Sequence, residues 1–386
     1  MTEQLSAVAD DAPSGRARVS WRAPLRHLDL VVLGLVVLGM GLLPRGLPPG
    51  VLVSGIVSGS VFSIQALGLV MVMRNDRIIN FAQVQLGILS ATLFAQLVIH
   101  SSGIRLLRSV CAPCVPGLPR PDAFYSTHPK TFLADLHAAG LDGLLIANFA
   151  ISLLLALVLA PLIAALVYLL LVRRFSTAPR LVLTVATIGI GQLIAGLGGR
   201  LTGGLFSGDI ERSNFNLPFS DPTFEVGLQV FRAGDVVAVA LAVLVFLFLG
   251  LFLRSRRGVA LRGAAEDPER AEALGINVAS IGSMAWMFAG VLSAFAGIVE
   301  TMRNAGTGQG ASGAFDTTTL VTILVVLVFA RQVNIWLVVP VAAAVGVLQQ
   351  TLLWNERSTA PFLVLLLPLV LAAFLLQGKR SSRADR

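Results

Sequence analysis

Charged residues are scarce in this chain of 386 residues: they make up 13% of it, whereas hydrophobic residues make up 55%. A soluble globular domain carries about 25% charged residues. The mean hydropathy of +0.82 and the grouping of the apolar residues into long runs exclude a soluble globular fold. The composition therefore predicts an all-α, polytopic integral membrane protein.

Lysine is almost absent: of the 29 basic residues, only Lys130 and Lys379 are lysines. A nucleotide-binding P-loop requires the pattern G-x-x-x-x-G-K-[ST], and neither lysine stands in such a pattern. We therefore expect no ATPase site in this chain. The arginines gather at the ends of apolar runs, as topology determinants do, so the net charge of +8 does not indicate nucleic-acid binding.

Ionisable residues are missing from the middle of the apolar runs, and Glu300, Asp316 and Arg331 stand near the ends of theirs. Carriers driven by protons or sodium usually hold a buried carboxylate or a charge relay for the driving ion. This lack favours a transporter powered by another energy source. Sodium can be held by carbonyl groups alone, so a stand-alone secondary carrier stays open as an alternative. An intramembrane enzyme is not expected, because no His/Glu metal set or Ser/Lys pair lies within the runs.

Cysteine occurs only twice, as Cys111 and Cys114 in a C-A-P-C motif. A thioredoxin-like motif would need a βαβ context. A zinc site would need two further ligands at suitable spacing, and His128 and His137 are irregularly placed. A location outside the cytoplasm permits a disulfide between the two cysteines, closing a small structural loop. No metal site is expected.

Ten apolar segments predict the membrane-spanning helices. They are residues 28–43, 51–73, 79–99, 144–172, 181–199, 235–253, 279–300, 316–330, 335–354 and 361–377. A helix needs about 20 residues to cross the hydrocarbon core. Because 28–43 and 316–330 are marginal in length, the prediction is about ten spans, within a range of eight to ten.

Basic residues predict the orientation of these spans, since short cytoplasmic connections are enriched in Arg and Lys. Most of the basic residues fall in the two termini and in alternate connections, which places both termini in the cytoplasm. The chain is thus predicted to consist of a cytoplasmic arm 1–27, a transmembrane domain 28–378 and a cytoplasmic tail 379–386. The transmembrane domain contains two long, irregular outer loops, 100–143 and 201–234, and a cytoplasmic loop, 254–278.

The cytoplasmic loop contains Arg256–Asn277, the longest charged run between two strongly apolar segments in the second half of the chain. Asp267 can cap a helix, Pro268 suits its first turn, and Gly275 ends it. The loop therefore predicts a helix of about two turns over Pro268–Leu274, lying on the membrane surface. From composition alone, a solvated connector explains the loop equally well.

Two stretches of the sequence carry a family resemblance. Gly258, Ala260, Arg262, Ala265-Glu266-Asp267, Ala271 and Leu274-Gly275-Ile276-Asn277 resemble the cytoplasmic coupling loop of the branched-chain amino acid ABC transporter permeases of the high-affinity type. Ala66–Leu69, followed by Ile78-Ile79-Asn80-Phe81-Ala82 and Gly87, resembles that family's junction between two early spans. The resemblance covers about residues 51–376.

The resemblance implies the permease subunit of an ABC importer in the plasma or inner membrane, moving branched-chain amino acids by alternating access. Its implied partners are two cytoplasmic ATPase subunits, which bind the ATP, a second permease subunit and an extracytoplasmic solute-binding protein, besides the membrane lipid. Urea, short amides or sugars remain alternative cargoes. By resemblance, the ATPase-coupling residues are Arg262, Glu266, Asp267, Ala271 and Gly275, and Arg262 would be a charge partner within the loop.

Polar side chains in the second and third segments are candidates for the translocation path. Asn80, Gln83 and Gln85 begin the third segment, and Ser63 and Gln65 lie in the second. Neutral amides in apolar surroundings need partners, so these face protein or a water-filled path. For each residue, lining a path and fixing helix packing by hydrogen bonds are both open. The family commonly has His-Gly after N-F-A, where this chain has Gln83-Val84. Weaker candidates, in the fifth segment, are Thr184, Thr187 and Gln192.

Glycines at helical spacing predict close contacts between helices. Gly55-x-x-x-Gly59 stands in the second segment, and Gly189, Gly191 and Gly196 stand in the fifth. Small residues let two helix backbones approach each other in a membrane. We expect these glycines to serve packing.

Overall fold

The computed structural model describes residues 28–99, 142–175, 178–205, 222–304, 317–331, 335–358 and 360–371. In these residues the chain is almost entirely helical, and a single two-stranded hairpin makes up the sheet structure. An all-α protein with membrane-spanning helices is therefore confirmed. The arm 1–27, the tail 379–386 and both cysteines lie outside the described residues, so the predictions made for them stay predictions.

Every one of the ten predicted segments contains a helix. In chain order the elements are α1 (Leu28–Gly39), the 3₁₀ turn η2 (Met40–Leu42), α2 (Pro49–Asp76), α3 (Ala82–Ile99), α7 (Asp142–Val167), the π-helical η4 (Tyr168–Arg173), α8 (Arg180–Leu205), β1 (Phe224–Val226), β2 (Gln229–Phe231), α9 (Ala233–Arg254), α10 (Arg256–Glu266), α11 (Pro268–Ala273), α12 (Val278–Arg303), α13 (Thr317–Phe329) and α14 (Ile335–Glu356), followed by a helix over Ala360–Leu371.

Six helices are long and apolar enough to cross a membrane: α2, α7 with η4, α8, α9, α12 and α14. Among the described residues, the apolar helices Ala82–Val98, Thr318–Phe329 and Ala360–Leu371 are shorter, and α1 has only 12 residues. The protein is thus a multi-pass membrane protein, but the count of ten spans is not confirmed. Eighteen residues of helix rise about 27 Å, close to the thickness of the hydrocarbon core, so the shorter helices fall near or below that limit.

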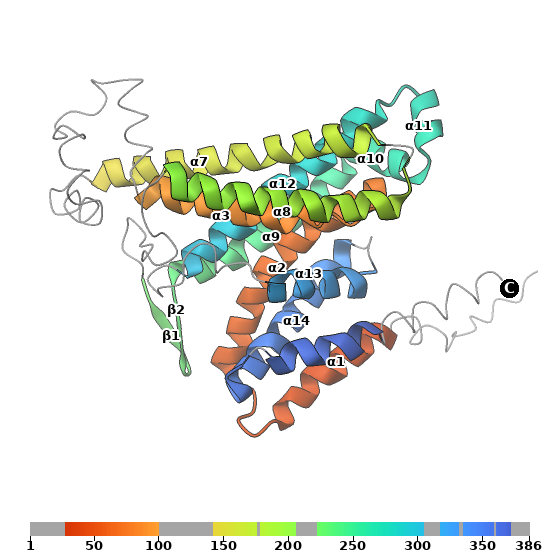
Figure 1. Cartoon of the computed structure of the whole chain (residues 1–386). Helices are drawn as coiled ribbons and strands as arrows, with labels where there is room; N and C mark the ends of the chain where they lie inside the picture. The colour runs from red at the N-terminus through yellow and green to blue at the C-terminus, as the bar shows by residue number, and fades with distance from the viewer. Residues whose placement is uncertain are drawn as a thin grey trace, which may run out of the picture.

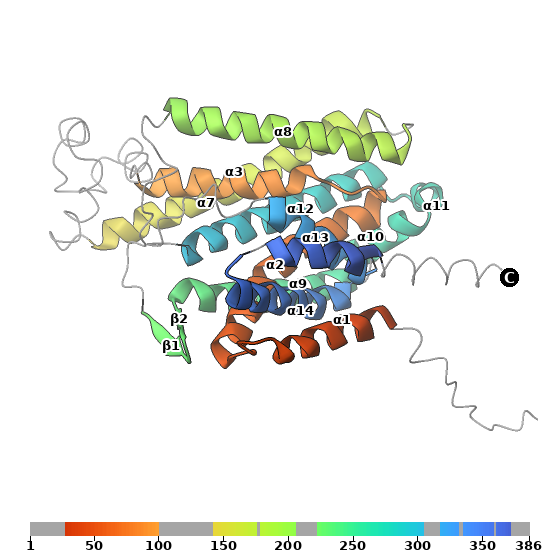
Figure 2. The same cartoon turned by 60° about the horizontal axis from the view of Figure 1, so that its bottom comes forward.

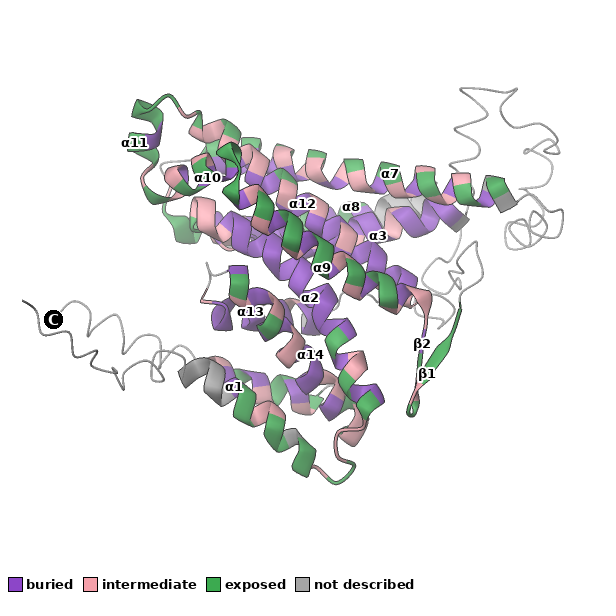
Figure 3. Cartoon of the chain, turned by 180° about the vertical axis from the view of Figure 1, so that it is seen from behind, coloured by how far each residue is buried: buried purple, intermediate pink, exposed green. Residues whose placement is uncertain are grey.

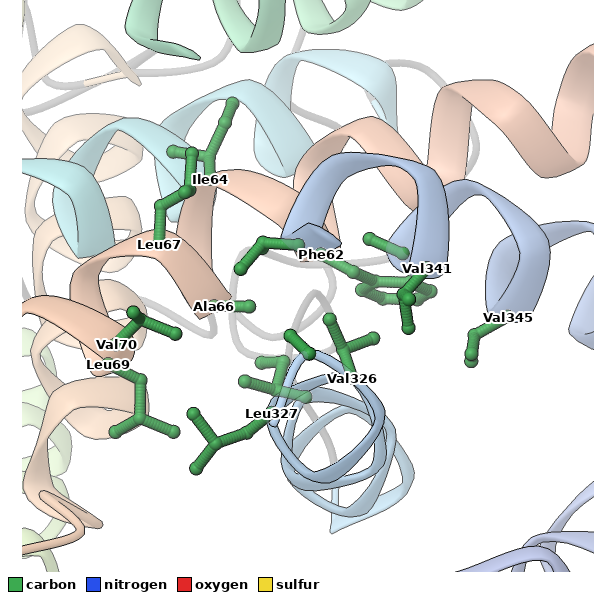
Figure 4. Packing of buried hydrophobic residues seen from close by; sticks show 14 of the residues in the cluster. Phe62, Ile64, Ala66, Leu67, Leu69, Val70, Val326, Leu327, Val341 and Val345 are labelled. Atoms are coloured by element: carbon green, nitrogen blue, oxygen red, sulfur yellow. The ribbon is translucent and has the colours of Figure 1, made fainter. Parts of the chain in front are cut away.

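Helix α2 is the centre of the bundle, where it contacts α9, α12, α13 and α14 (Figures 1 and 2). Its most apolar window is 83% buried, whereas those of α8 and α9 are 28% buried, so α2 is covered by protein and the other two present broad outer faces (Figure 3). Phe62 of α2 packs with Val326 of α13 and Val341 of α14 in the main apolar core (Figure 4).

The glycines of α2 explain its close contact with α14. A Cβ atom added to Gly55 or Gly59 would come within 3.0 Å of the α14 backbone, and one added to Gly346 would come equally close to the α2 backbone. The packing prediction for Gly55 and Gly59 is therefore confirmed. For Gly189 and Gly196 it is wrong within this chain, because nothing lies within 4 Å of the added Cβ there. Both glycines lie on the exposed side of α8.

Two connections that were predicted to lie on opposite sides of the membrane are found at opposite ends of the bundle. The hairpin β1–β2 lies at one end, and α10 with α11 lies at the other (Figures 1 and 2). The loop 201–234 is not irregular throughout, because α8 continues to Leu205 and the hairpin occupies Phe224–Phe231. The placement agrees with loops 201–234 and 254–278 lying on opposite sides.

Candidate functional site

The junction between α2 and α3 is a sharply turned segment held by neighbouring helices. Arg77 has a left-handed backbone with φ of 56°, which ends α2, and the side-chain oxygen of Asn80 accepts a hydrogen bond of 3.1 Å from the Ala82 amide at the start of α3. The Thr187 hydroxyl of α8 accepts from the Phe81 amide at 3.1 Å and lies within donating distance of two carbonyls, Thr184 of its own helix at 2.6 Å and Ile79 at 3.2 Å. The junction is therefore held at the end of α2, at the start of α3 and by hydrogen bonds to α8.

A narrow cavity lies against this junction. Its lining combines the polar residues Gln65, Asn80 and Gln83 with an apolar set made up of Leu69, Ile79, Phe81, Val84, Leu320, Ile323 and Leu324. In this conformation it has room for about one water molecule. Three of the five predicted path residues thus share one cavity, which α13 covers with an apolar wall.

The polar part of the cavity joins three helices. Gln83 of α3 donates from Nε2 to the Gln65 backbone carbonyl of α2 at 3.0 Å. Gln65 donates from Nε2 to the Ser293 hydroxyl of α12 at 3.0 Å, and Ser293 donates to the Gln83 backbone carbonyl. A Cβ on Gly68 would come within 3.0 Å of the Gln83 amide, so the bare backbone there leaves space for that side chain.

The other two predicted path residues lie elsewhere. The Ser63 hydroxyl donates to the Ser60 carbonyl of its own helix at 2.7 Å. Gln85 is half-buried and packs near Gly191 on α8. Ser293 of this site was not predicted, because one serine within an apolar run carries no distinctive signal in the sequence. Only the fold brings Ser293 next to the two glutamines.

At the other functional region, the predicted helix in loop 254–278 is confirmed over Pro268–Ala273. Asp267 caps it by accepting from the Arg270 amide at 3.1 Å, and Gly275 has the left-handed φ of 80° that ends it. No helix was predicted for the first part of the loop, where α10 occupies Arg256–Glu266 and is capped by Ser255.

The predicted coupling residues divide into exposed and buried ones. Arg262, Glu266 and Gly275 are exposed, whereas Ala271 is only 3% exposed and holds α11 against the rest of the chain. The Asp267 carboxylate caps α11 and forms an ion pair with Arg270 at 3.5 Å. The role of Arg262 as a charge partner within the loop stays a prediction.

A short chain of contacts links α10 to the cavity. The Arg77 guanidinium donates to the Ala265 carbonyl of α10 at 3.2 Å, and the residues directly after Arg77 enter the cavity lining. Asp76 accepts from the Trp286 indole of α12 at 2.7 Å, and Trp286 lies 6.1 Å from the Tyr168 ring. The end of α2 is therefore bound both to α10 and to the body of the bundle.

A cluster of buried charges lies at the end of α12 away from α10. Arg303 pairs with Asp235 of α9 at 2.8 Å and with Glu300 at 2.7 Å, and the three side chains are 13%, 14% and 20% exposed. Asp235 also caps α9 by accepting from the Arg232 amide at 2.9 Å. Sequence reasoning placed Glu300 near an outer end but missed the cluster, because its members meet only in the fold. No group of three or more possible metal ligands occurs in the part of the chain that the structure describes.

Comparison with known families gives one match. The family model described as the branched-chain amino acid transport system permease component matches residues 51–374. Comparisons with curated proteins and with solved structures find no significant match. The matched range covers most of the chain and includes both the cavity and the α10–α11 pair, and the chain therefore belongs to the branched-chain amino acid transport permease family.

Proposed function

We propose that this chain is the transmembrane subunit of an ABC importer for branched-chain amino acids, driven by a separate ATPase that docks on α10 and α11. Permeases of this family work in general with an ATPase and a binding protein. The orientation predicted from the basic residues puts α10, α11 and both termini in the cytoplasm. In the complex, this chain pairs with a second permease subunit and receives solute from an extracytoplasmic binding protein.

The observation that carries the proposal is the hydrogen bond between Arg77 and the Ala265 carbonyl. A rigid-body shift of α10, produced by closure of a docked ATPase, would pull on the end of α2. Ile79, Asn80 and Phe81, which begin two residues after Arg77, line the cavity. A short capped helix pair can therefore transmit movement to the cavity wall, which alternating access requires.

The cargo assignment rests on the family and on the cavity lining. The lining contains neutral amides and aliphatic side chains but no charged side chain. Such a cavity suits a solute with an aliphatic body and polar N–H groups. A branched-chain amino acid has both, and urea or a short amide has the N–H groups without the aliphatic body.

The test is uptake by the permease reconstituted with its ATPase and binding protein. We expect ATP-dependent leucine uptake that survives collapse of the ion gradients. We expect Arg77→Asn to reduce this uptake about five- to tenfold with the ATPase still bound, since an exposed hydrogen bond contributes about 1–1.4 kcal/mol. Asparagine tolerates the left-handed backbone. Arg357→Asn is the matched control, because Arg357 also has a left-handed backbone, with φ of 54°, and should leave uptake unchanged. Uptake that follows an ion gradient without ATP would refute the importer.

A further inference from the structure

Gln65 and Gln83 each keep one buried polar atom without a hydrogen-bond partner. Their side-chain Oε1 atoms are unpaired, although both residues are only 1% exposed and both side-chain Nε2 groups donate hydrogen bonds. A buried carbonyl left without a partner costs about 1–3 kcal/mol. An unpaired buried polar group calls for an explanation, and these two oxygens differ from other such groups in belonging to residues that line the cavity.

The two amide groups belong to the same cavity and are held rigidly. Gln83 is positioned by the Gln65 carbonyl and by the space over Gly68, and Gln65 is positioned by Ser293. Each Nε2 group makes at least one of these contacts, whereas the two Oε1 atoms have no partner and are free to accept from a ligand. Leu320, Ile323 and Leu324 form the apolar wall contributed by α13.

We propose that Gln65 Oε1 and Gln83 Oε1 form an acceptor pair that receives the N–H donors of the transported solute, while the α13 wall receives its aliphatic part. The inference rests on the proposed function and deepens it by naming the atoms that contact the cargo. An ammonium group, with three donors and no acceptor, is the best match for two carbonyl oxygens. Because the cavity has room for about one water molecule, a solute larger than that enters only when the α13 wall moves.

Ser293 is a positioning residue in this site. Its hydroxyl accepts from Gln65 and donates to the Gln83 backbone carbonyl, which links α12 to both glutamines. A shift of α12 relative to α2 and α3 would therefore move the two acceptors apart. Movement of α12, transmitted through the Ser293 hydrogen bonds, would in this way release the solute.

Gln83→Met and Gln65→Met test the acceptor pair in the reconstituted complex, because methionine keeps the length of glutamine without its polar atoms. We expect ATP-driven leucine uptake to fall roughly tenfold, which corresponds to about 1.4 kcal/mol, while the ATPase stays bound to the complex. Gln96→Met is the matched control: Gln96 is a fully buried glutamine of α3 whose amide has no partner and does not line the cavity. Leucine uptake by the Gln96→Met complex should equal that by the unmodified complex.

Gln83→Glu distinguishes the acceptor role from a purely structural one and serves if the methionine variants do not fold. A carboxylate keeps the acceptor oxygens and adds negative charge, but it loses the N–H that Gln83 donates to the Gln65 carbonyl. That loss affects all solutes alike, so the KM for leucine should still fall relative to that for a neutral amide such as acetamide or for urea. Equal effects on leucine and on neutral solutes would assign the site to neutral N–H groups and overturn the ammonium assignment. Equal uptake by Gln83→Met and Gln96→Met would overturn the acceptor pair, whereas lack of ATP-driven uptake in the unmodified complex would instead refute the proposed function.

Discussion

Replacing Gly346 by leucine should prevent α14 from packing on α2, with little folded protein recovered. A Cβ atom at this position would lie within 3.0 Å of the Gly55 and Gly59 backbone, where no rotamer change can relieve the contact. Since α2 is the centre of the bundle, separating α14 from it also opens the apolar core around Phe62 and Val341. Overpacking of a core costs about 1–3 kcal/mol even when side chains can adjust, and here the neighbour is backbone.

Size-exclusion chromatography and thermal unfolding in detergent measure this effect. Gly34→Leu is the matched control, because Gly34 also lies in an apolar helix, α1, and nothing lies within 4 Å of an added Cβ. We expect a monodisperse peak and a near-normal Tm for Gly34→Leu, and aggregation or a strongly lowered Tm for Gly346→Leu. Equal behaviour of the two variants would contradict the close α2–α14 contact.

Arg303→Met should destabilise the protein by about 3–5 kcal/mol, because it leaves Asp235 and Glu300 buried without their cation. The expected readout is a large fall in Tm. Adding Asp235→Asn and Glu300→Gln to the same chain removes the two uncompensated charges and should recover a substantial part of the loss. Asparagine at 235 retains an oxygen for the cap of α9.

Arg357→Met is the control for the loss of an arginine, because Arg357 is exposed. Its Tm should stay close to that of the unmodified protein. If Arg303→Met unfolds at the same temperature as Arg357→Met, the cluster does not hold α9 and α12 together, and the description of it as a structural element is wrong.

Most of the helices could be predicted from the sequence, because long apolar runs in a membrane have few alternatives to a helix. The helix after Asp267 could also be predicted, since Asp267, Pro268 and Gly275 are local signals whose effect does not depend on the fold. Helix α10 was missed because Gly258 and Gly263 reduce helix propensity and charged residues surround them. In the fold, Gly258 permits the close turn against Leu253 that starts this helix.

The candidate site could be predicted only in part. Buried amides in an apolar run indicate that partners exist, and this identified Gln65, Asn80 and Gln83, but the pattern does not say which partners they have. Ser63 gave the same signal and uses its own helix instead. The contacts of Ser293 with Gln65 and of Arg303 with Asp235 join residues 228 and 68 positions apart, so they follow from the packing of whole helices.

Co-purification of an ATPase with the permease tests the central claim most directly. The unmodified protein, extracted in detergent, should retain its ATPase subunit, and Glu266→Lys and Gly275→Val should lose it. Both changes alter the exposed α10–α11 surface, and valine cannot readily adopt the left-handed backbone of Gly275.

Glu225→Lys and Gly227→Val are the matched controls on the hairpin at the opposite end, where Gly227 has φ of 62°. Retention of the ATPase by the controls and its loss from the two α10–α11 variants is the predicted result. Equal retention by all four variants, or no ATPase with any of them and with the unmodified protein, would contradict the account.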